Sequence, residues 1–222
     1  KVYRNEGCPL QTTATWFSDD GTLMNSDWTT SLAWGDADGD GDLDIAVGNG
    51  QTMDGVPNRL FLNQNGAMDP TVAWESDESE RTLSVAWGDV DGDGDLDLVV
   101  GNDESPNRLY LNDGGTLQTT AAWASGDLDV TESVAWGDVD GDGDLDLATG
   151  NEFAPNKVYL NQGGTLHTFA AWASADDDNT YAVAWGDFDG DGDLDLAAAN
   201  GEDPLKVYEN QHGTLETDAS WQ

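Results

Sequence analysis

The sequence predicts an all-β protein, a β-propeller built from four-stranded antiparallel blades. First, four long segments of the chain are near copies of one another, and each carries the same Asp-rich string. Second, apolar residues within each copy recur with the alternation of β-strands, and no window long enough for a helix carries a helical apolar stripe. Third, four short strands in a unit of about 49 residues, repeated in tandem, are typical of propeller blades.

The repeat is most visible in a tryptophan of its first strand. This residue recurs at intervals of 53, 49 and 49 residues, at Trp34, Trp87, Trp136 and Trp185. A second shared segment, of the type Asn-Arg-Leu-Tyr-Leu-Asn followed by Gly-Thr-Leu, occurs five times. We therefore expect a single propeller domain over residues 1–222, with four full blades and a preceding half blade. The half repeat and the four full repeats are expected at 1–16, 31–74, 83–123, 132–172 and 181–221.

Each repeat holds four expected strands, which we letter A to D in chain order. In the second repeat, strand A is expected at 84–88 and strand B at the apolar run 96–101. Strand C is expected at 108–112 and strand D at 116–123, on either side of Asn-Asp-Gly-Gly turn chemistry. A β-solenoid is the structural rival, but its coils are usually shorter than this unit.

The string between strands A and B predicts a calcium site. Its first, third, fifth, seventh and ninth residues are Asp, and its sixth is Gly, which permits a sharp turn. Calcium takes six to eight oxygen ligands, and alternating carboxylates in a tight turn can converge on one ion. Side chains at positions 1, 3, 5 and 9, with the main-chain carbonyl of position 7, are the expected ligands. The candidate residues are Asp36, Asp38, Asp40, Asp42, Asp44, Asp89, Asp91, Asp93, Asp95, Asp97, Asp138, Asp140, Asp142, Asp144, Asp146, Asp187, Asp189, Asp191, Asp193 and Asp195.

Other interpretations of this string fit less well. An EF-hand needs a bidentate Glu at position 12 and two flanking helices, whereas position 12 here lies in an expected strand. In the nonapeptide calcium roll the loops follow one another directly. Magnesium prefers fewer carboxylates and retains several waters. A merely solvated turn would leave five carboxylates repelling one another within nine residues. Four Ca²⁺ ions are therefore the predicted cofactors.

The string Ala-Trp-Gly-Asp-x-Asp-Gly-Asp-Gly-Asp-Leu-Asp-Leu resembles the FG-GAP or VCBS repeat, and the resemblance covers essentially the whole chain. That repeat is the unit of integrin α-subunit propellers and of many bacterial surface proteins. The resemblance implies that the loop joining the first two strands of each blade binds calcium. It also implies about seven blades, whereas this chain holds four and a half, so closure of the ring is left open.

Charge and composition exclude several kinds of partner. The chain has 45 Asp and Glu against 7 Lys and Arg, and its net charge of −38 repels nucleic acid and anionic membrane surfaces. No apolar stretch approaches the roughly 18 residues of a membrane-spanning helix, so no membrane insertion is expected. So much acid is typical of disordered chains, but ten Trp argue against disorder. The lone Cys8 excludes an internal disulfide framework. Since the first residue is Lys, we expect a mature or excerpted form.

Other repeated residues have structural interpretations. Five of the seven cations stand at the start of strand C, where we expect each to pair with a nearby carboxylate rather than to bind an anion. They are Lys1, Arg59, Arg108, Lys157 and Lys206. The two Trp of each repeat are expected to pack between blades, whereas Trp28 stands outside the pattern in a loop. Neither His167 nor His212 has a motif-like Ser or Cys partner, so no catalytic residue is predicted.

The order of the loops along the chain assigns each one to one of the two faces of the expected propeller. The A–B and C–D loops of an up-and-down blade share one face, and the B–C and D–A loops share the other. The B–C and D–A loops differ between repeats, and variable loops on a rigid scaffold are where binding usually resides. We therefore expect a secreted, extracellular or cell-surface module for adhesion or recognition, which binds a protein or glycan through the B–C/D–A loop face without catalysis.

Two alternative functions remain open at this point. The chain could be a self-assembling structural subunit of a filament or surface layer, joined through the strand edge of the N-terminal half blade at 1–16. It could also be an accessory or catalytic propeller of a polysaccharide-degrading enzyme, because carboxylate pairs of the kind used in glycoside hydrolysis are abundant here.

Overall fold

A computed structural model describes residues 28–50 and 56–221 of the chain. Its secondary structure in these ranges consists of β-strands, with no helix. Accordingly, no helix in the described part of the chain is long and apolar enough to cross a membrane. The all-β prediction is confirmed for these residues, while the expected half blade at 1–16, with Lys1 and Cys8, lies outside them.

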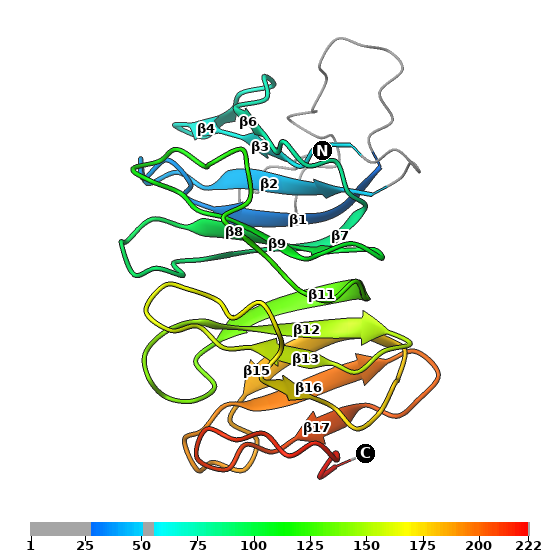
Figure 1. The fold of residues 1–222 in the computed structure, drawn as a ribbon. Helices are drawn as coiled ribbons and strands as arrows, with labels where there is room; N and C mark the ends of the chain where they lie inside the picture. The colour runs from blue at the N-terminus through cyan, green and yellow to red at the C-terminus, as the bar shows by residue number, and fades with distance from the viewer. Residues whose placement is uncertain (1–27, 51–55, 222) are drawn as a thin grey trace, which may run out of the picture.

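The strands form four successive antiparallel sheets, each in simple meander order (Figure 1). The first sheet contains β1 (Thr29–Gly35), β2 (Asp44–Asn49), β3 (Arg59–Phe61) and β6 (Trp74–Glu75). The second contains β7 (Thr82–Gly88), β8 (Asp97–Asn102), β9 (Arg108–Tyr110) and β10 (Trp123–Ala124). The third contains β11 (Val130–Gly137), β12 (Asp146–Glu152), β13 (Lys157–Tyr159) and β14 (Trp172–Ala173). The fourth contains β15 (Thr180–Gly186), β16 (Asp195–Asn200) and β17 (Lys206–Tyr208).

The place of the fourth strand in the last sheet is marked by a single bridge between Val207 and Trp221. The C–D connection of the first sheet carries a small hairpin of β4 (Asn63–Gln64) and β5 (Ala67–Met68). We call the four sheets blades 1 to 4, and their strands in meander order keep the letters A to D. The sheets are consistent with propeller blades.

Strand D is much shorter than the sequence predicts. In blade 2 the expected strand 116–123 shrinks to β10, which begins at Trp123. The chain before it bends toward the preceding D–A loop, where the Asp77 amide donates to the Thr119 carbonyl. The hydroxyls of Thr119 and Thr120 both donate to Asp77 Oδ2. These local side-chain bonds compete with the sheet ladder, and the prediction was wrong for residues 118–122.

The hydrophobic core is divided into three parts, each lying between two consecutive blades. Between blades 2 and 3, for example, Val99 and Leu109 pack with Leu147 and Tyr159. Strand B of the two inner blades is therefore buried on both sides, and Leu98, Val99 and Val100 of β8 are each fully buried. Because one blade cannot bury both of its faces alone, stability depends on the stacking of neighbours.

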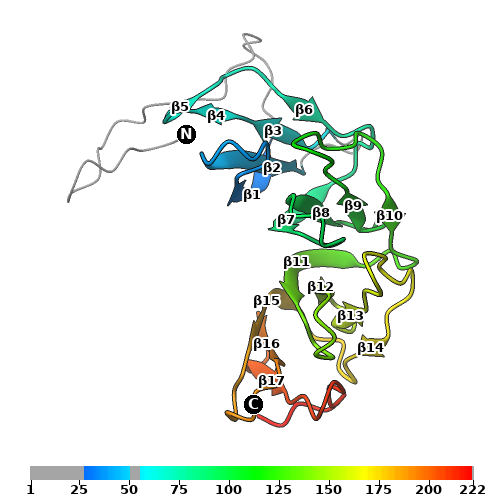
Figure 2. The same ribbon diagram turned by 90° about the vertical axis from the view of Figure 1, so that its left-hand side faces the viewer.

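The four blades form a curved, open stack (Figure 2). The A strands lie along the inner side of the curve, and successive blades touch through β1 and β7, β7 and β11, and β11 and β15. Over the described residues, no sheet joins blade 4 to blade 1. The ring is thus not closed by these residues, and the number of blades in a functional ring stays a prediction.

Candidate metal centres in the Asp loops

Each Asp string forms the hairpin loop between strands A and B. In blade 2 the ladder pairs Gly88 with Asp97, so the hairpin brings position 9 opposite the residue that precedes position 1. The loop turns through two left-handed glycines, Gly92 with φ 75° and Gly94 with φ 99°. Only glycine adopts such values without strain, which is the role expected for the Gly at position 6.

The hairpin brings the carboxylates of positions 1 and 3 together in all four loops. A third carboxylate joins them, from position 5 in the first loop and from position 9 in the other three. The ligand atoms in each group lie within 4.8 Å of one another. The groups are Asp36, Asp38 and Asp40; Asp89, Asp91 and Asp97; Asp138, Asp140 and Asp146; and Asp187, Asp189 and Asp195.

The carboxylate at position 1 has an unpaired oxygen in the first two loops, whereas in the third and fourth loops Oδ1 of Asp138 and Asp187 accepts from the Gly141 and Gly190 amides. Asp89 Oδ2 accepts a hydrogen bond from the Gly94 amide at 3.1 Å, and Asp36 Oδ2 accepts one from the Gly41 amide at 2.9 Å. The other oxygen of each residue, Oδ1, is buried and has no hydrogen-bond partner. An unpaired buried carboxylate oxygen is costly unless something positive occupies the space beside it. The donor set therefore fits a hard cation such as calcium.

The Asp at position 9 joins position 2 of its own loop to the end of strand C. Asp97 accepts from the Val90 amide at 2.9 Å and from the Asn112 amide at 2.8 Å. Burial raises the pKa of Asp97 to about 6, against the lowering effect of these two amides. Asp146 repeats both contacts, and burial raises its pKa to about 6 as well. A bound cation would offset the cost of keeping these carboxylates charged.

The side chain at position 7 points away from the cluster. Asp95 Oδ2 accepts from the Gly114 amide at 2.6 Å, and Asp144 Oδ2 accepts from the Gly163 amide at the same distance. Asp42 and Asp193 make the equivalent bond to the C–D turn of their own blades. Position 7 thus leaves its main-chain carbonyl as the group able to face a cation. The position 5 residues Asp93, Asp142 and Asp191 each accept a hydrogen bond from the amide two residues on.

Sequence reasoning missed an asparagine that joins neighbouring loops. Asn112 donates from Nδ2 to the Leu96 carbonyl of its own loop and to the Ala37 carbonyl in the loop of the preceding blade. Asn161 and Asn210 repeat this contact with the two following pairs of blades. The signal was present, since each of the four full repeats ends its strand C in Asn. The contact ties the Asp loops of blades 1, 2 and 3 to the blade that follows each of them.

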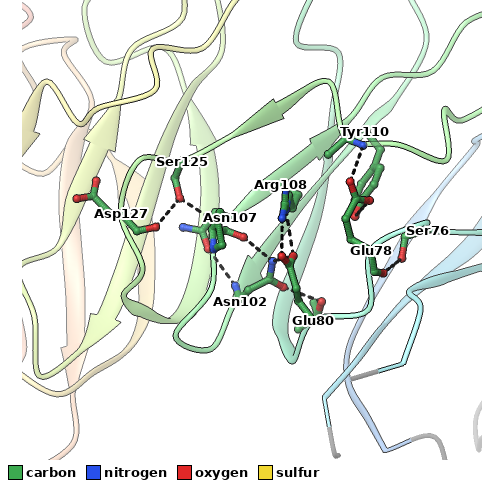
Figure 3. Close-up of polar contacts among 12 residues, drawn as sticks. Ser76, Glu78, Glu80, Asn102, Asn107, Arg108, Tyr110, Ser125 and Asp127 are labelled. Carbon is green, nitrogen blue, oxygen red and sulfur yellow. Dashed lines mark hydrogen bonds and ion pairs between the residues drawn. The ribbon is translucent and has the colours of Figure 1, made fainter. Parts of the chain in front are cut away.

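The described cations of strand C pair with carboxylates, as expected. Figure 3 shows Arg108 of β9 in an ion pair with Glu80, Nη2 to Oε1 at 2.6 Å, while Glu80 also accepts from Asn102. Tyr110 donates to Glu78 in the same loop. Lys157 pairs likewise with Asp127 and Asp129, and Lys206 with Asp176 and Asp178, whereas Arg59 pairs with Glu75 of β6 in its own blade. The prediction of carboxylate pairing is confirmed for these four.

Both tryptophans of the repeat pack between blades. The strand D residue Trp123 meets Tyr159 of the next blade edge-on, with ring centroids 5.5 Å apart. Its Nε1 donates to the main-chain carbonyl of His167 in the next blade at 3.2 Å. The strand A residue Trp136 lies against Gly88 of the preceding blade. The packing prediction is therefore confirmed at these internal positions.

The loops also separate onto two faces as predicted. The A–B loops meet the C–D turns through the position 7 carboxylates described above. On the other face, B–C loops bond to D–A segments. The Asp103 amide donates to the Arg81 carbonyl of the segment before its own blade at 2.8 Å, whereas the Phe153 amide donates to the Asp178 carbonyl of the segment after its blade at 3.1 Å. Trp28 lies on this second face, where its carbonyl accepts from the Gly50 amide. Parts of the longest loops, at 17–27 and 51–55, fall outside the described ranges.

Family models match most of the chain. The FG-GAP-like repeat matches residues 48–100, 89–149 and 146–198, and the FG-GAP repeat matches residues 28–67. The chain belongs to the FG-GAP repeat family. The matched segments contain all four Asp loops, so the resemblance drawn from the Ala-Trp-Gly-Asp string is confirmed. FG-GAP repeats are typical of extracellular proteins and are generally non-catalytic modules.

Solved structures support the FG-GAP fold without indicating a function. The computationally designed Ika4 protein is similar with a TM-score of 0.56 and 10% identity, over 84% of this chain and 93% of that one. The V. cholerae biofilm matrix protein Bap1 is similar with a TM-score of 0.54 and 16% identity, over 83% of this chain and 27% of that one. BBS1N, in a complex with ARL6DN, has a TM-score of 0.55 and 12% identity, over 85% and 56%. A comparison with curated proteins finds no match.

Proposed function

We propose that this FG-GAP repeat protein is an extracellular calcium-binding module that recognises a protein or glycan and does not catalyse a reaction. The observation that carries the proposal is the buried, unpaired Oδ1 of Asp36 and Asp89, each beside two further carboxylates. Calcium is abundant outside cells, where sites of millimolar affinity are filled. The FG-GAP family and the extreme acidity of the chain agree with such a setting.

Calcium would be held by the side chains of positions 1, 3, 5 and 9 and by the carbonyl of position 7. In blade 2 these are Asp89, Asp91, Asp93 and Asp97, with the Asp95 carbonyl. The role proposed for the ions is architectural. The loops of blades 1 to 3 are each tied through Asn112 or its counterpart to the following blade, so filling one of these loops stabilises a contact between blades.

Recognition is assigned to the B–C/D–A loop face. Its most prominent side chain is Phe153, which is 73% exposed and has a φ of 53°, an unusual value for a bulky residue. A hydrogen bond from the Phe153 amide to the Asp178 carbonyl holds the residue in this conformation. Strained, exposed aromatic residues on a rigid loop are typical of binding surfaces. Trp28, which is 59% exposed, adds a second aromatic to the same face.

Thermal melts test the calcium part of the proposal. The protein stripped with EDTA is compared with the same protein in millimolar calcium, and isothermal titration counts the ions. Each site filled at about 100 times its dissociation constant adds about 2.7 kcal/mol to the free energy of unfolding. Up to four such increments predict a large upward shift of the midpoint. Equal midpoints with and without calcium would refute calcium binding.

Arrays of glycans and of extracellular matrix proteins test the recognition part. The labelled protein is applied in millimolar calcium as wild type, as Phe153→Ser and as Leu43→Ser. Leu43 is an exposed apolar residue of an Asp loop, on the opposite face, and serves as the matched control. We expect saturable binding that Phe153→Ser weakens at least tenfold and Leu43→Ser leaves unchanged. If the calcium-loaded protein binds nothing on either array, recognition fails as a function while the calcium sites stand.

A further inference from the structure

The three contacts between neighbouring blades are copies of one design. A Cβ placed on Gly35, Gly88 or Gly137 would lie 2.7, 2.8 or 2.6 Å from Cδ1 of a tryptophan in the following blade. The three glycines therefore form seats that only a residue without a side chain can provide. The tryptophans that occupy the seats are Trp87, Trp136 and Trp185.

A valine two residues before each tryptophan completes the contact. Val85, Val134 and Val183 are buried to 7 or 8% exposure against the preceding blade. The main-chain amide of each valine adds a hydrogen bond, donating to a serine hydroxyl of the preceding strand A at 3.1 to 3.2 Å. Side chains and main chain thus fix the same register three times.

The two ends of the stack carry the unmatched halves of this design. At the first end, Trp34 and Leu32 occupy the tryptophan and valine positions, and they are 46% and 56% exposed. We call this pair the head face. At the last end, the seat position is Gly186, and nothing lies within 4 Å of a Cβ placed there. One face thus offers an indole, and the other offers an open seat.

The surface around Gly186 is more apolar than the internal seats. Phe188 stands where the internal loops carry Ala37, Val90 and Val139; those three are buried, whereas Phe188 is 55% exposed. Leu205 takes the place of a buried asparagine and is exposed as well. Tyr181, in the same strand as the seat, is also exposed. We call Tyr181, Gly186, Phe188 and Leu205 the tail face, and exposed apolar surface of this kind marks an interaction site.

The tail face differs from the internal seats at two more positions. Ala182 replaces the serine that accepts the valine amide, and Ala199 replaces a glycine that closely approaches the following blade. On the head face, Leu32 replaces the β-branched valine that crowds that glycine. The change from valine to leucine removes a methyl group near the backbone, so it partly compensates for the added Cβ of Ala199. The two faces therefore depart from the internal design in related ways.

We propose that the tail face binds the head face of a second copy of this chain, with Trp34 of one copy seated on Gly186 of the other. The partner is a second copy because both complementary surfaces belong to this chain and three internal contacts show how they fit. The same contact would bring the Asn63 side chain of the second copy to the Phe188 carbonyl, as Asn112 meets Ala37 within one chain. Head-to-tail contacts of this kind close into rings when the rotation permits and otherwise extend.

Charge sets the conditions for this association. Two copies of a chain with a net charge of −38 repel each other, and salt screens the repulsion over about 10 Å at 0.1 M. Filled calcium sites reduce it further. We therefore expect association to increase with salt and with calcium, unlike an association built on ion pairs, which salt would weaken.

Sedimentation velocity and native mass spectrometry of the whole chain, in millimolar calcium and at rising salt and protein concentration, test the proposal. Gly186→Val fills the seat at a position where a Cβ meets no neighbour in the single chain, so we expect folding to be preserved, which far-UV circular dichroism checks. Trp34→Ala removes the indole. Leu128→Ser, at an exposed apolar position away from both faces, is the control. We expect oligomers for the wild type and for Leu128→Ser, and monomers for the other two variants.

Mixing the variants tests the head-to-tail geometry. Trp34→Ala retains a tail face and Gly186→Val retains a head face, so an equimolar mixture should give a one-to-one dimer that does not grow. A wild type that stays monomeric at every salt and protein concentration overturns the proposal, including the case in which other repeats cover these faces. Association that survives both substitutions, or a mixture that does not pair, overturns it as well.

Discussion

The indole of Trp136 lies so close to Gly88 of the preceding blade that a Cβ on Gly88 would stand 2.8 Å from Trp136 Cδ1. Such a contact shows that Gly88 is needed for close packing between blades rather than for a turn. Gly88→Val should push the two blades apart and lower the free energy of unfolding by about 1–3 kcal/mol. Chemical denaturation measures the change. Gly186→Val is the matched control, because the same repeat position has no neighbour there, and an equal loss in both variants would contradict the packing argument.

The asparagine at the end of strand C should contribute to stability according to its contacts. Asn112 donates to carbonyls in two blades, and its Ala substitution leaves a buried acceptor on Ala37 and a partly buried one on Leu96 without that donor. We expect a loss of about 1–3 kcal/mol. Asn63→Ala, at the same repeat position, removes a bond to the Leu43 carbonyl in a more exposed setting and should cost less. Equal denaturation midpoints for the two variants would show that the bridge between blades adds nothing.

Two carboxylates of one loop should differ in their effect on calcium binding. Asp89 has a buried, unpaired oxygen, whereas the Asp95 side chain is bonded to the Gly114 amide. Asp89→Asn should therefore abolish one of the four sites in isothermal titration, or weaken it at least tenfold. Asp95→Asn should keep the number of ions and lower thermal stability even in EDTA, because a turn bond is weakened. If Asp95→Asn removed a site and Asp89→Asn did not, the assigned geometry would be wrong.

The half-buried carboxyl of Glu132 predicts a pH effect. Burial raises its pKa above the ordinary value of 4.5, and the charges of Glu152 and Asp103 add to the rise. A carboxyl whose folded-state pKa is raised favours the folded state below its unfolded pKa, and this contribution is lost as the pH rises through the folded pKa. Glu132→Gln should thus gain stability over the wild type as the pH rises above about 4.5.

Thermal melts in saturating calcium between acidic and neutral pH measure this gain, which we expect to be a few degrees at neutral pH. Glu104→Gln, at an exposed position, controls for the loss of one negative charge. If the difference in melting temperature between Glu132→Gln and the wild type did not change with pH over this range, the raised pKa would be contradicted.

The residues of the repeat by themselves determined the blade and its loop. Alternating apolar residues such as Val85 and Trp87 specify strand A, because side chains of a strand point alternately to its two faces. The spacing of the Asp residues specifies a hairpin with converging carboxylates, because all the participants lie within nine residues. Features set by neighbours in the sequence can be inferred from the sequence.

Only the tertiary structure decided which faces meet. The pattern placed Trp136 on one face of its strand, but its seat on Gly88 joins residues of two blades. Likewise, Asp77 shortens strand D by bonding to Thr119 and Thr120 of the following repeat, and nothing in either segment alone predicts that pairing. Such contacts depend on the stacking of whole blades, because each sheet has two apolar faces and the sequence does not state which neighbour covers each one.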